Sequence, residues 1–148
     1  MYKCILVPLD GSGRAEKILP HVVSLAHCYG ARVTFLQVIE LTPMLIVDYG
    51  LPGGILPELV EQTKTEAEEY LTSWKNDFTK KDIEASVRVE QGPIVETIIK
   101  VAEEESADLI AMASHGRTGL SHVFYGSVAS GVLHRVDRAL LLIRSRDG

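Results

Sequence analysis

The sequence has little of what marks several classes of protein. Its two cysteines, Cys4 and Cys28, form neither a CxxC pair nor a metal-binding spacing, so we expect two buried, reduced thiols. No apolar run approaches the roughly 20 residues that a membrane-spanning helix needs. A strand predicted over residues 2–7 leaves no room for a signal peptide. We therefore expect a cytoplasmic protein that does not bind membranes.

Basic charge is also scarce. Fifteen Lys and Arg against 20 Asp and Glu give a net charge of −5. A protein that binds nucleic acid independently of sequence needs a basic face, so we expect no nucleic-acid partner. The five histidines show no HExxH-like spacing, and we expect no metal site. A chain of 148 residues with 46% hydrophobic and 24% charged residues is typical of one globular domain, residues 1–148.

What the sequence does contain is a regular alternation of strand and helix patterns. Short apolar runs predict strands, and apolar residues three or four apart predict amphipathic helices. Residues 84–90 alternate strictly between apolar and polar side chains, which is typical of an edge strand. Ser12 and Gly30 are placed to cap the first helix. Strands are predicted at 3–9, 32–39, 84–90, 109–112 and 139–144, and helices at 14–29, 57–78, 94–105 and 127–136.

This order of elements predicts an α/β fold. It is that of an open, doubly wound sheet of five parallel strands with helices on both faces. In such sheets the ligand binds beyond the carboxyl ends of the strands, where the strand order reverses. Residues 42–56 are expected to form a loop that acts either as a lid or as a partner surface.

The most informative segment follows the strand at 109–112. Gly116 and Gly126 flank nine residues, and Ser127 opens the last helix. Backbone N–H groups converge where a glycine-containing loop meets a helix N-terminus, and the helix dipole adds positive charge there. Glycine also allows positive φ and a close approach of the backbone to a ligand. These residues favour a phosphate or nucleotide site; the alternative is that the glycines only punctuate an ordinary loop.

Two further features lie at the margins of the predicted sheet. Asp10 follows the first strand, where its carboxylate either accepts a hydrogen bond from a ribose hydroxyl or an adenine amino group, or caps the first helix. The last strand, residues 139–145, is apolar on both faces although it could lie at an edge. Such an edge favours pairing with another chain, so we predict a homodimer joined through it.

The sequence resembles a single-domain universal stress protein over essentially its whole length. The resemblance rests on several short segments, of which the last block is highly specific. They are residues 5–12 (ILVPLDGS), 37–39 (QVI), 92–93 (GP), 107–110 (ADLI), 114–120 (SHGRTGL) and 126–129 (GSVA).

The resemblance implies a Rossmann-like nucleotide-binding fold with strand order 3-2-1-4-5. Members with the pattern Gly-x2-Gly-x9-Gly-Ser/Thr bind ATP, and members commonly dimerise through the last strand. The resemblance implies that Asp10 and the backbone around Val38 hold adenine and ribose, that Gly116 and the residues from Gly126 hold phosphates, and that the ligand is ATP, ADP or AMP, with or without Mg²⁺. The implied nucleotide-binding residues are Pro8, Leu9, Asp10, Val38, Met112, Ala113, His115, Gly116, Arg117, Gly119, Gly126, Ser127 and Val128.

The chain departs from this pattern at Ala113, which replaces the first glycine of the motif. The methyl group is harmless if residue 113 is extended. It costs about 1 kcal/mol or more if φ must be positive, and it could also crowd a phosphate. Two functions follow: a dimeric, ATP-binding regulator of the stress response with an unidentified protein partner, or a nucleotide-independent interaction scaffold of the same fold. A flavodoxin-like redox protein is a weaker third alternative.

No residue is assigned a catalytic role. The chain lacks GxxxxGK[ST], which places a lysine on the β and γ phosphates and a hydroxyl on Mg²⁺. Arg117 either reaches a phosphate or remains solvated, as exposed arginines usually do. His115 lies inside the motif without a defined role. Any ATP hydrolysis is expected to stay far below the median enzyme rate of roughly 10 s⁻¹.

Overall fold

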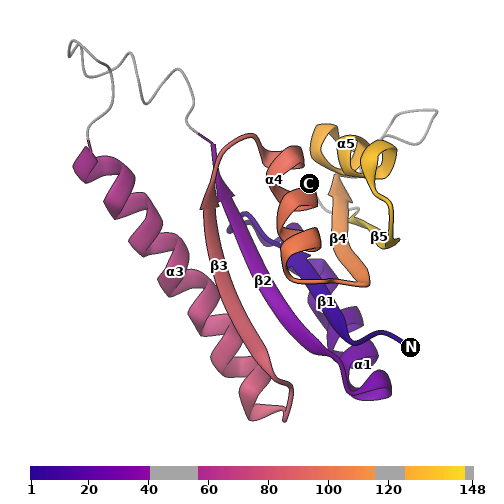
Figure 1. The fold of residues 1–148 in the computed structure, drawn as a ribbon. Helices are drawn as coiled ribbons and strands as arrows, with labels where there is room; N and C mark the ends of the chain where they lie inside the picture. Colours follow the sequence, from indigo (N-terminus) through magenta and orange to yellow (C-terminus); the bar gives the residue numbers. More distant parts are fainter. Residues whose placement is uncertain (41–56, 116–125, 146–148) are drawn as a thin grey trace.

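The structure is a computed structural model that describes residues 1–40, 57–115 and 126–145, and Figure 1 shows their arrangement. Within these ranges, five parallel strands form one sheet, as the sequence pattern predicted, in the order β3-β2-β1-β4-β5 that the family resemblance implied. The elements are β1 (Cys4–Pro8), η1 (Ala15–Ile18), α1 (Leu19–Tyr29), β2 (Arg32–Ile39), α3 (Pro57–Lys80), β3 (Ala85–Gln91), α4 (Ile94–Glu104), β4 (Leu109–His115), α5 (Ser127–Arg135) and β5 (Ala139–Ser145).

Helices cover both faces of the sheet, as expected for a doubly wound fold (Figure 1). α1 and α3 pack on one face, where the rings of Phe35 and Phe78 meet edge to face with centroids 4.9 Å apart. α4 and α5 cover the other face around Leu6, Ile98 and Val132. Apolar side chains are thus buried on both faces of the central strand. None of the helices in the described ranges is long and apolar enough to cross a membrane.

The strand order creates a crevice between β1 and β4. β1 pairs with β2 on one side and with β4 on the other. After β1 the chain builds the sheet outward through β2 and β3, then crosses back to add β4 and β5. The connections that follow β1 and β4 therefore diverge, which opens a space at the carboxyl ends of these two strands. β3 and β5 are the outer strands, as the alternation in residues 84–90 predicted for the first of them.

The predicted helix at 14–29 is divided in the structure. Residues 15–18 form the 3₁₀ turn η1, and α1 begins at Leu19. Pro20 explains the division, because it has no N–H to donate to the carbonyl of Glu16 in a continuous α-helix. Gly30 ends α1 as predicted: it has φ of 64°, and its N–H donates to the carbonyl oxygen of Ala26.

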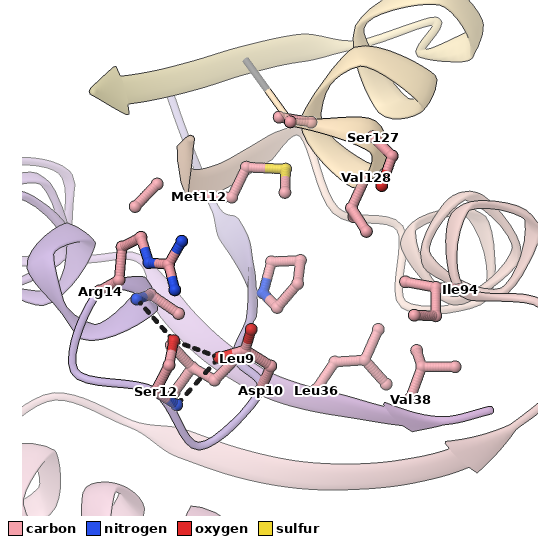
Figure 2. A pocket seen from close by; sticks show the side chains of 15 residues that line it. Leu9, Asp10, Ser12, Arg14, Leu36, Val38, Ile94, Met112, Ser127 and Val128 are labelled. Carbon is pink, nitrogen blue, oxygen red and sulfur yellow. Dashed lines mark hydrogen bonds between the residues drawn. The ribbon is translucent and has the colours of Figure 1, made fainter. Parts of the chain in front are cut away.

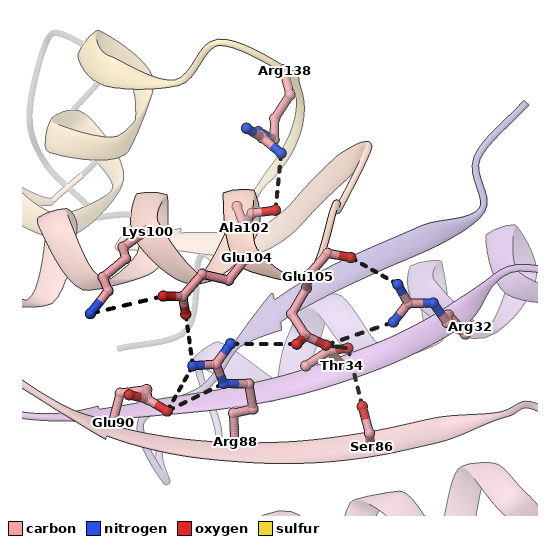
Figure 3. Close-up of polar contacts among 10 residues, drawn as sticks. All are labelled: Arg32, Thr34, Ser86, Arg88, Glu90, Lys100, Ala102, Glu104, Glu105 and Arg138. Atoms are coloured by element: carbon pink, nitrogen blue, oxygen red, sulfur yellow. Dashed lines mark hydrogen bonds and ion pairs between the residues drawn. The ribbon is translucent and has the colours of Figure 1, made fainter.

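Acidic side chains at the end of α4 are bound by arginines of the sheet. A helix C-terminus disfavours negative charge, yet Glu104 and Glu105 lie there. The guanidinium of Arg88 on β3 lies 2.9 Å from carboxylate oxygens of both Glu90 and Glu104 and 3.4 Å from Glu105 (Figure 3). Arg32 on β2 donates to the carbonyl oxygen of Glu105 at 2.8 Å. These contacts fix α4 over β2 and β3 and offset the unfavourable placement.

The expectation that both cysteines are buried was wrong for one of them. Both thiols are free. Cys4 is buried in β1, and this burial raises the pKa of its thiol. Cys28 is exposed on α1. It lies two residues after the buried Ala26, and positions two apart on a helix do not share a face.

Candidate functional site

A cavity of about 310 Å³ lies at the carboxyl ends of β1 and β4, where the switch in strand order predicts a ligand site. Its walls come from the end of β1 and the turn after it, from β2 and β4, and from the first turns of α4 and α5 (Figure 2). The lining residues are Pro8, Leu9, Asp10, Ser12, Arg14, Ala15, Leu36, Val38, Ile94, Met112, Ala113, Gly126, Ser127, Val128 and Ala129.

One wall of the cavity is apolar. Leu36 and Val38 reach it from β2, and Ile94 reaches it from the first turn of α4 (Figure 2). Met112 of β4 lies on another side, and its side chain is 6% exposed. Flat, weakly polar groups such as a purine ring bind well against walls of this kind.

The turn after β1 is held by its own side chains. Ser12 donates to Asp10 Oδ1 from its backbone N–H at 2.9 Å and from its hydroxyl at 2.6 Å. The Ser12 hydroxyl oxygen in turn accepts a hydrogen bond from the N–H of Ala15 at 3.1 Å. Ser12 thus binds the first N–H of η1, although Arg14 and not Ser12 occupies the N-cap position, and Asp10 supports Ser12 rather than capping the helix itself. The carboxylate of Asp10 lies at the cavity with a fixed orientation.

The first turn of α5 borders the cavity. Gly126 precedes the helix with φ of 82° and ψ of 160°, a conformation that favours glycine. Ser127, Val128 and Ala129 follow and line the cavity. The first N–H groups of a helix have no partner within it, and the helix dipole adds partial positive charge. The arrangement fits an anion, and Gly126 has the positive φ that its place in the motif predicts.

Ala113 adopts the conformation in which its methyl group causes no backbone strain. It lies within β4 and pairs with Ile143 of β5, and its φ is not positive. The strand runs to His115, three residues further than the apolar pattern at 109–112 predicted. Of the two alternatives for the missing glycine, the one that requires strain is therefore removed.

The structure brings most of the sequence-predicted residues together. Nine of them line the cavity. Five of these nine precede residue 113 in the sequence, and the other four are residue 113 and residues after it. His115 ends β4, and Gly116, Arg117 and Gly119 lie outside the described residues. The nine are Pro8, Leu9, Asp10, Val38, Met112, Ala113, Gly126, Ser127 and Val128.

Sequence reasoning missed part of the lining. Six residues line the cavity that were not predicted as site residues: Ser12, Arg14, Ala15, Leu36, Ile94 and Ala129. Arg14 and Ile94 each lie in the turn or helix start that follows a strand end, which is where doubly wound sheets place ligand contacts. That position was a usable signal for both. Leu36 gave no such signal, because it reads as an ordinary core residue of its strand.

A hydrogen bond from α3 holds the turn that carries the polar lining. The Tyr70 hydroxyl donates to Glu16 Oε2 at 2.5 Å, and Glu16 belongs to η1. Burial, and next the hydrogen bond to Glu16, raise the pKa of Tyr70 well above its ordinary value. Tyr70 is therefore a neutral donor, and it fixes η1, the neighbour of Asp10 and Arg14, to the long helix.

An open α/β sheet with a ligand-sized cavity at its switch point defines a broad class of nucleotide-binding and related proteins. The family within that class follows from comparison with known sequences. The model of the universal stress protein family matches residues 1–144. The chain belongs to the universal stress protein family.

Individual relatives agree with this assignment over nearly the whole chain. Universal stress protein MJ0577 of Methanocaldococcus jannaschii is 32% identical over 158 residues, covering 99% of this chain and 98% of that protein. Universal stress protein MJ0531 of the same organism is 30% identical over 145 residues, covering 97% of this chain and 83% of that protein. The solved structure of MJ0577 superposes with a TM-score of 0.82 at 29% identity, covering 100% of this chain and 99% of that one.

Proposed function

We propose that this chain is a regulatory protein of the universal stress protein family that binds an adenine nucleotide, ATP first and ADP or AMP as alternatives. One observation carries the proposal: a single cavity joins an apolar wall, a fixed carboxylate and the N-terminus of a helix. Adenine fits the first, ribose hydroxyls the second and phosphates the third.

The proposed ligand lies across the carboxyl ends of the strands. The adenine packs beside Val38 and Ile94, which form part of the apolar wall. Asp10 binds a ribose hydroxyl or the adenine amino group through Oδ2, because Oδ1 already accepts two hydrogen bonds from Ser12. The phosphates bind the N–H groups that follow Gly126.

The remaining motif residues complete this proposal. We propose that Gly116 binds phosphate and that His115, Arg117 and Gly119 belong to the nucleotide site, as the family resemblance implies. Mg²⁺ would accompany ATP on its phosphate oxygens, and we assign no protein ligand to it. We propose that residues 1–148 act as one domain in the cytoplasm.

Two solved structures of the same fold support adenine nucleotides as the ligands to test. One is a universal stress protein in complex with cAMP, with a TM-score of 0.67 at 19% identity. The other is the universal stress protein of Archaeoglobus fulgidus in complex with dAMP, with a TM-score of 0.63 at 22% identity. At these identities the likeness is one of fold. The assignment of a ligand to this chain therefore rests on its own cavity and motif.

The proposed protein is a homodimer joined through β5. This strand is the outer strand next to β4, and Leu140, Leu141, Leu142 and Ile143 are only partly buried. An apolar outer strand with unpaired backbone groups favours pairing with a second copy. The expected result in sedimentation velocity is a dimer; a monomer at micromolar concentration would contradict it.

Proline substitutions at two adjacent positions of β5 test where the dimer interface lies. In a parallel strand the N–H groups of neighbouring residues point to opposite sides, so of Leu141 and Leu142 one faces β4 and the other faces away. Leu141→Pro and Leu142→Pro therefore form a matched pair. Both variants lose side-chain packing against the core, but we expect only one to lose a hydrogen bond to β4 as well, and the other to become monomeric with the smaller loss of stability. If both remain dimeric, the interface lies elsewhere.

Calorimetric titration of the protein with ATP and Mg²⁺, repeated with AMP, tests nucleotide binding. We expect micromolar binding of ATP by the native chain, because Ala113 is extended and unstrained. Ala113→Gly serves as the matched variant and should change the affinity little. Absence of binding by both proteins would reject the proposal.

The second candidate function is a nucleotide-independent interaction scaffold of the same fold. One observation favours it: Ala113 lines the cavity, so its methyl group stands where the motif has a glycine. Binding of ATP only after Ala113→Gly would establish this function for the native chain. ATP hydrolysis separates the two poorly, because we expect turnover far below roughly 10 s⁻¹ for the nucleotide-binding protein and none for the scaffold.

A further inference from the structure

Arg14 brings a full positive charge to the cavity from the side of β1. It lies between β1 and η1 and is half-buried. Among the residues that line the cavity in the described ranges, Arg14 and Asp10 are the two charged ones. Figure 2 shows the Arg14 side chain on the side of the cavity across from Val38 and Ile94. The cation therefore lies away from the apolar wall proposed for the adenine.

The backbone on both sides of Arg14 is held in place. Before it, Ser12 is bound to Asp10 Oδ1 by two hydrogen bonds. After it, the N–H of Ala15 donates to the Ser12 hydroxyl oxygen, and Glu16 accepts the hydrogen bond from Tyr70. A charged side chain on a fixed backbone loses less conformational freedom when it binds a ligand. This favours a binding role over an incidental surface position.

A guanidinium is suited to phosphate in particular. It has five N–H donors in a planar fork and stays protonated, so it binds phosphate oxygens by charge-assisted hydrogen bonds. Arg14 makes contacts within the protein as well, and five donors allow it to serve both. The N–H groups of α5 supply only partial charge, whereas the β and γ phosphates add full negative charges that a cation stabilises.

We propose that Arg14 binds the phosphate chain of the nucleotide and makes the cavity select for charge, with ATP and ADP bound more tightly than AMP and all three more tightly than adenosine. The inference rests on the proposed adenine-nucleotide function and deepens it. It assigns a residue outside the glycine motif to the recognition of the ligand's charge.

The test is calorimetric titration of the native protein and of Arg14→Gln with ATP plus Mg²⁺, AMP and adenosine. We expect Arg14→Gln to weaken ATP binding about tenfold, as loss of a charge-assisted contact should. Adenosine binding should change less than twofold. Arg14→Lys keeps the charge without the planar fork, and it should recover part of the ATP affinity. The loss should also shrink at high salt.

Lys17→Gln is the matched control. It removes the same charge three residues further along, from an exposed residue that does not line the cavity. We expect this variant to bind ATP within twofold of the native protein. An equal loss in Arg14→Gln and Lys17→Gln would assign the effect to overall charge and overturn the inference.

Further outcomes separate this inference from the proposed function. Equal weakening of ATP and adenosine in Arg14→Gln would mean that Arg14 supports the turn or stacks on the base, and would overturn the inference alone. Unchanged ATP affinity would do the same. If the native protein binds none of the three ligands, the proposed function fails and this inference fails with it.

Discussion

The two ends of the neighbouring strands β1 and β4 differ in what the residues around them contact. Where they begin, the carboxylate of Asp108 accepts hydrogen bonds from the backbone N–H groups of Lys3 and Cys4 at 2.9 to 3.1 Å. The guanidinium of Arg138 donates to the carbonyl oxygens of Ala102 and Ala107 at 3.0 and 2.7 Å. Side chains there bind backbone groups and join the elements that enter the sheet.

Where the same strands end, backbone and side-chain groups border a cavity instead. Asp10 and Ser12 follow β1, and Gly126 opens the helix that follows β4. The starts of the strands thus hold elements together, whereas the ends border the cavity that we propose as the ligand site. Substitutions at the two ends should separate stability from binding, and the predictions below test this difference.

The largest effect is expected for Asp108→Ala. Loss of its charge-assisted hydrogen bonds leaves N–H groups at the start of β1 without their acceptor, at a cost of about 2–3 kcal/mol in the free energy of unfolding. Urea denaturation measures this loss. Asp108→Asn keeps one acceptor oxygen and should lose less. ATP affinity should remain within about twofold of the native value; a tenfold change would show that the two ends are not independent.

Gly126→Ala should reduce ATP affinity more than it reduces stability, which is the reverse of what we expect for Asp108→Ala. A methyl side chain at φ of 82° strains the backbone by about 1–2 kcal/mol and displaces the N–H groups of α5 that we assign to phosphate. We expect ATP affinity to fall more than tenfold in calorimetry, with a smaller loss of stability than in Asp108→Ala.

Gly13→Ala provides the control for this substitution. Gly13 has no positive φ, and a methyl group there would meet no atom within 4 Å. It should therefore leave stability and ATP affinity nearly unchanged. If Gly126→Ala binds ATP as well as Gly13→Ala does, the helix N-terminus is not the phosphate site.

The sequence was sufficient for the fold because the pattern of each element is local. Alternation in residues 84–90 identified an outer strand, and a strict order of strands and helices identified the doubly wound sheet. The glycine motif indicated a helix N-terminus at a strand end, and Gly126 has the conformation that this role requires.

Features that depend on contacts between distant residues could not be predicted. Arg88 and Glu104 lie on different elements, so nothing in the sequence paired them. The division of the first helix was within reach, because Pro20 cannot donate a hydrogen bond, but the apolar periodicity across it outweighed that signal. The position of Arg14 in the cavity wall was also within reach, because Arg14 follows the end of the first strand, but periodicity alone does not reveal it.

Tyr70→Phe is expected to have a smaller effect than either end substitution. It removes the hydrogen bond to Glu16 while keeping the ring, which costs about 1 kcal/mol in the free energy of unfolding. Because Glu16 follows the turn that carries Arg14, we also expect ATP to bind about twofold to threefold more weakly. Urea denaturation and calorimetry on the same variant measure both. Equal ATP affinity would restrict Tyr70 to a structural role.

The smallest effect concerns the pH dependence of that same contact. Burial first, and the hydrogen bond to Glu16 next, raise the pKa of Tyr70 above its ordinary value near 10. When the folded pKa is raised, the unfolded chain releases its proton first as pH increases, so the stabilisation is fully present below pH 10 and is lost above it.

Tyr70→Phe has no phenol to titrate, whereas the Cys4 thiol, whose pKa burial also raises, is common to both proteins. The difference in unfolding free energy between the native protein and Tyr70→Phe should therefore be constant from pH 7 to 9 and shrink as pH rises beyond 10. Urea denaturation across this range measures it, and a difference that stays constant at high pH would mean that the Tyr70 hydroxyl is not held by Glu16.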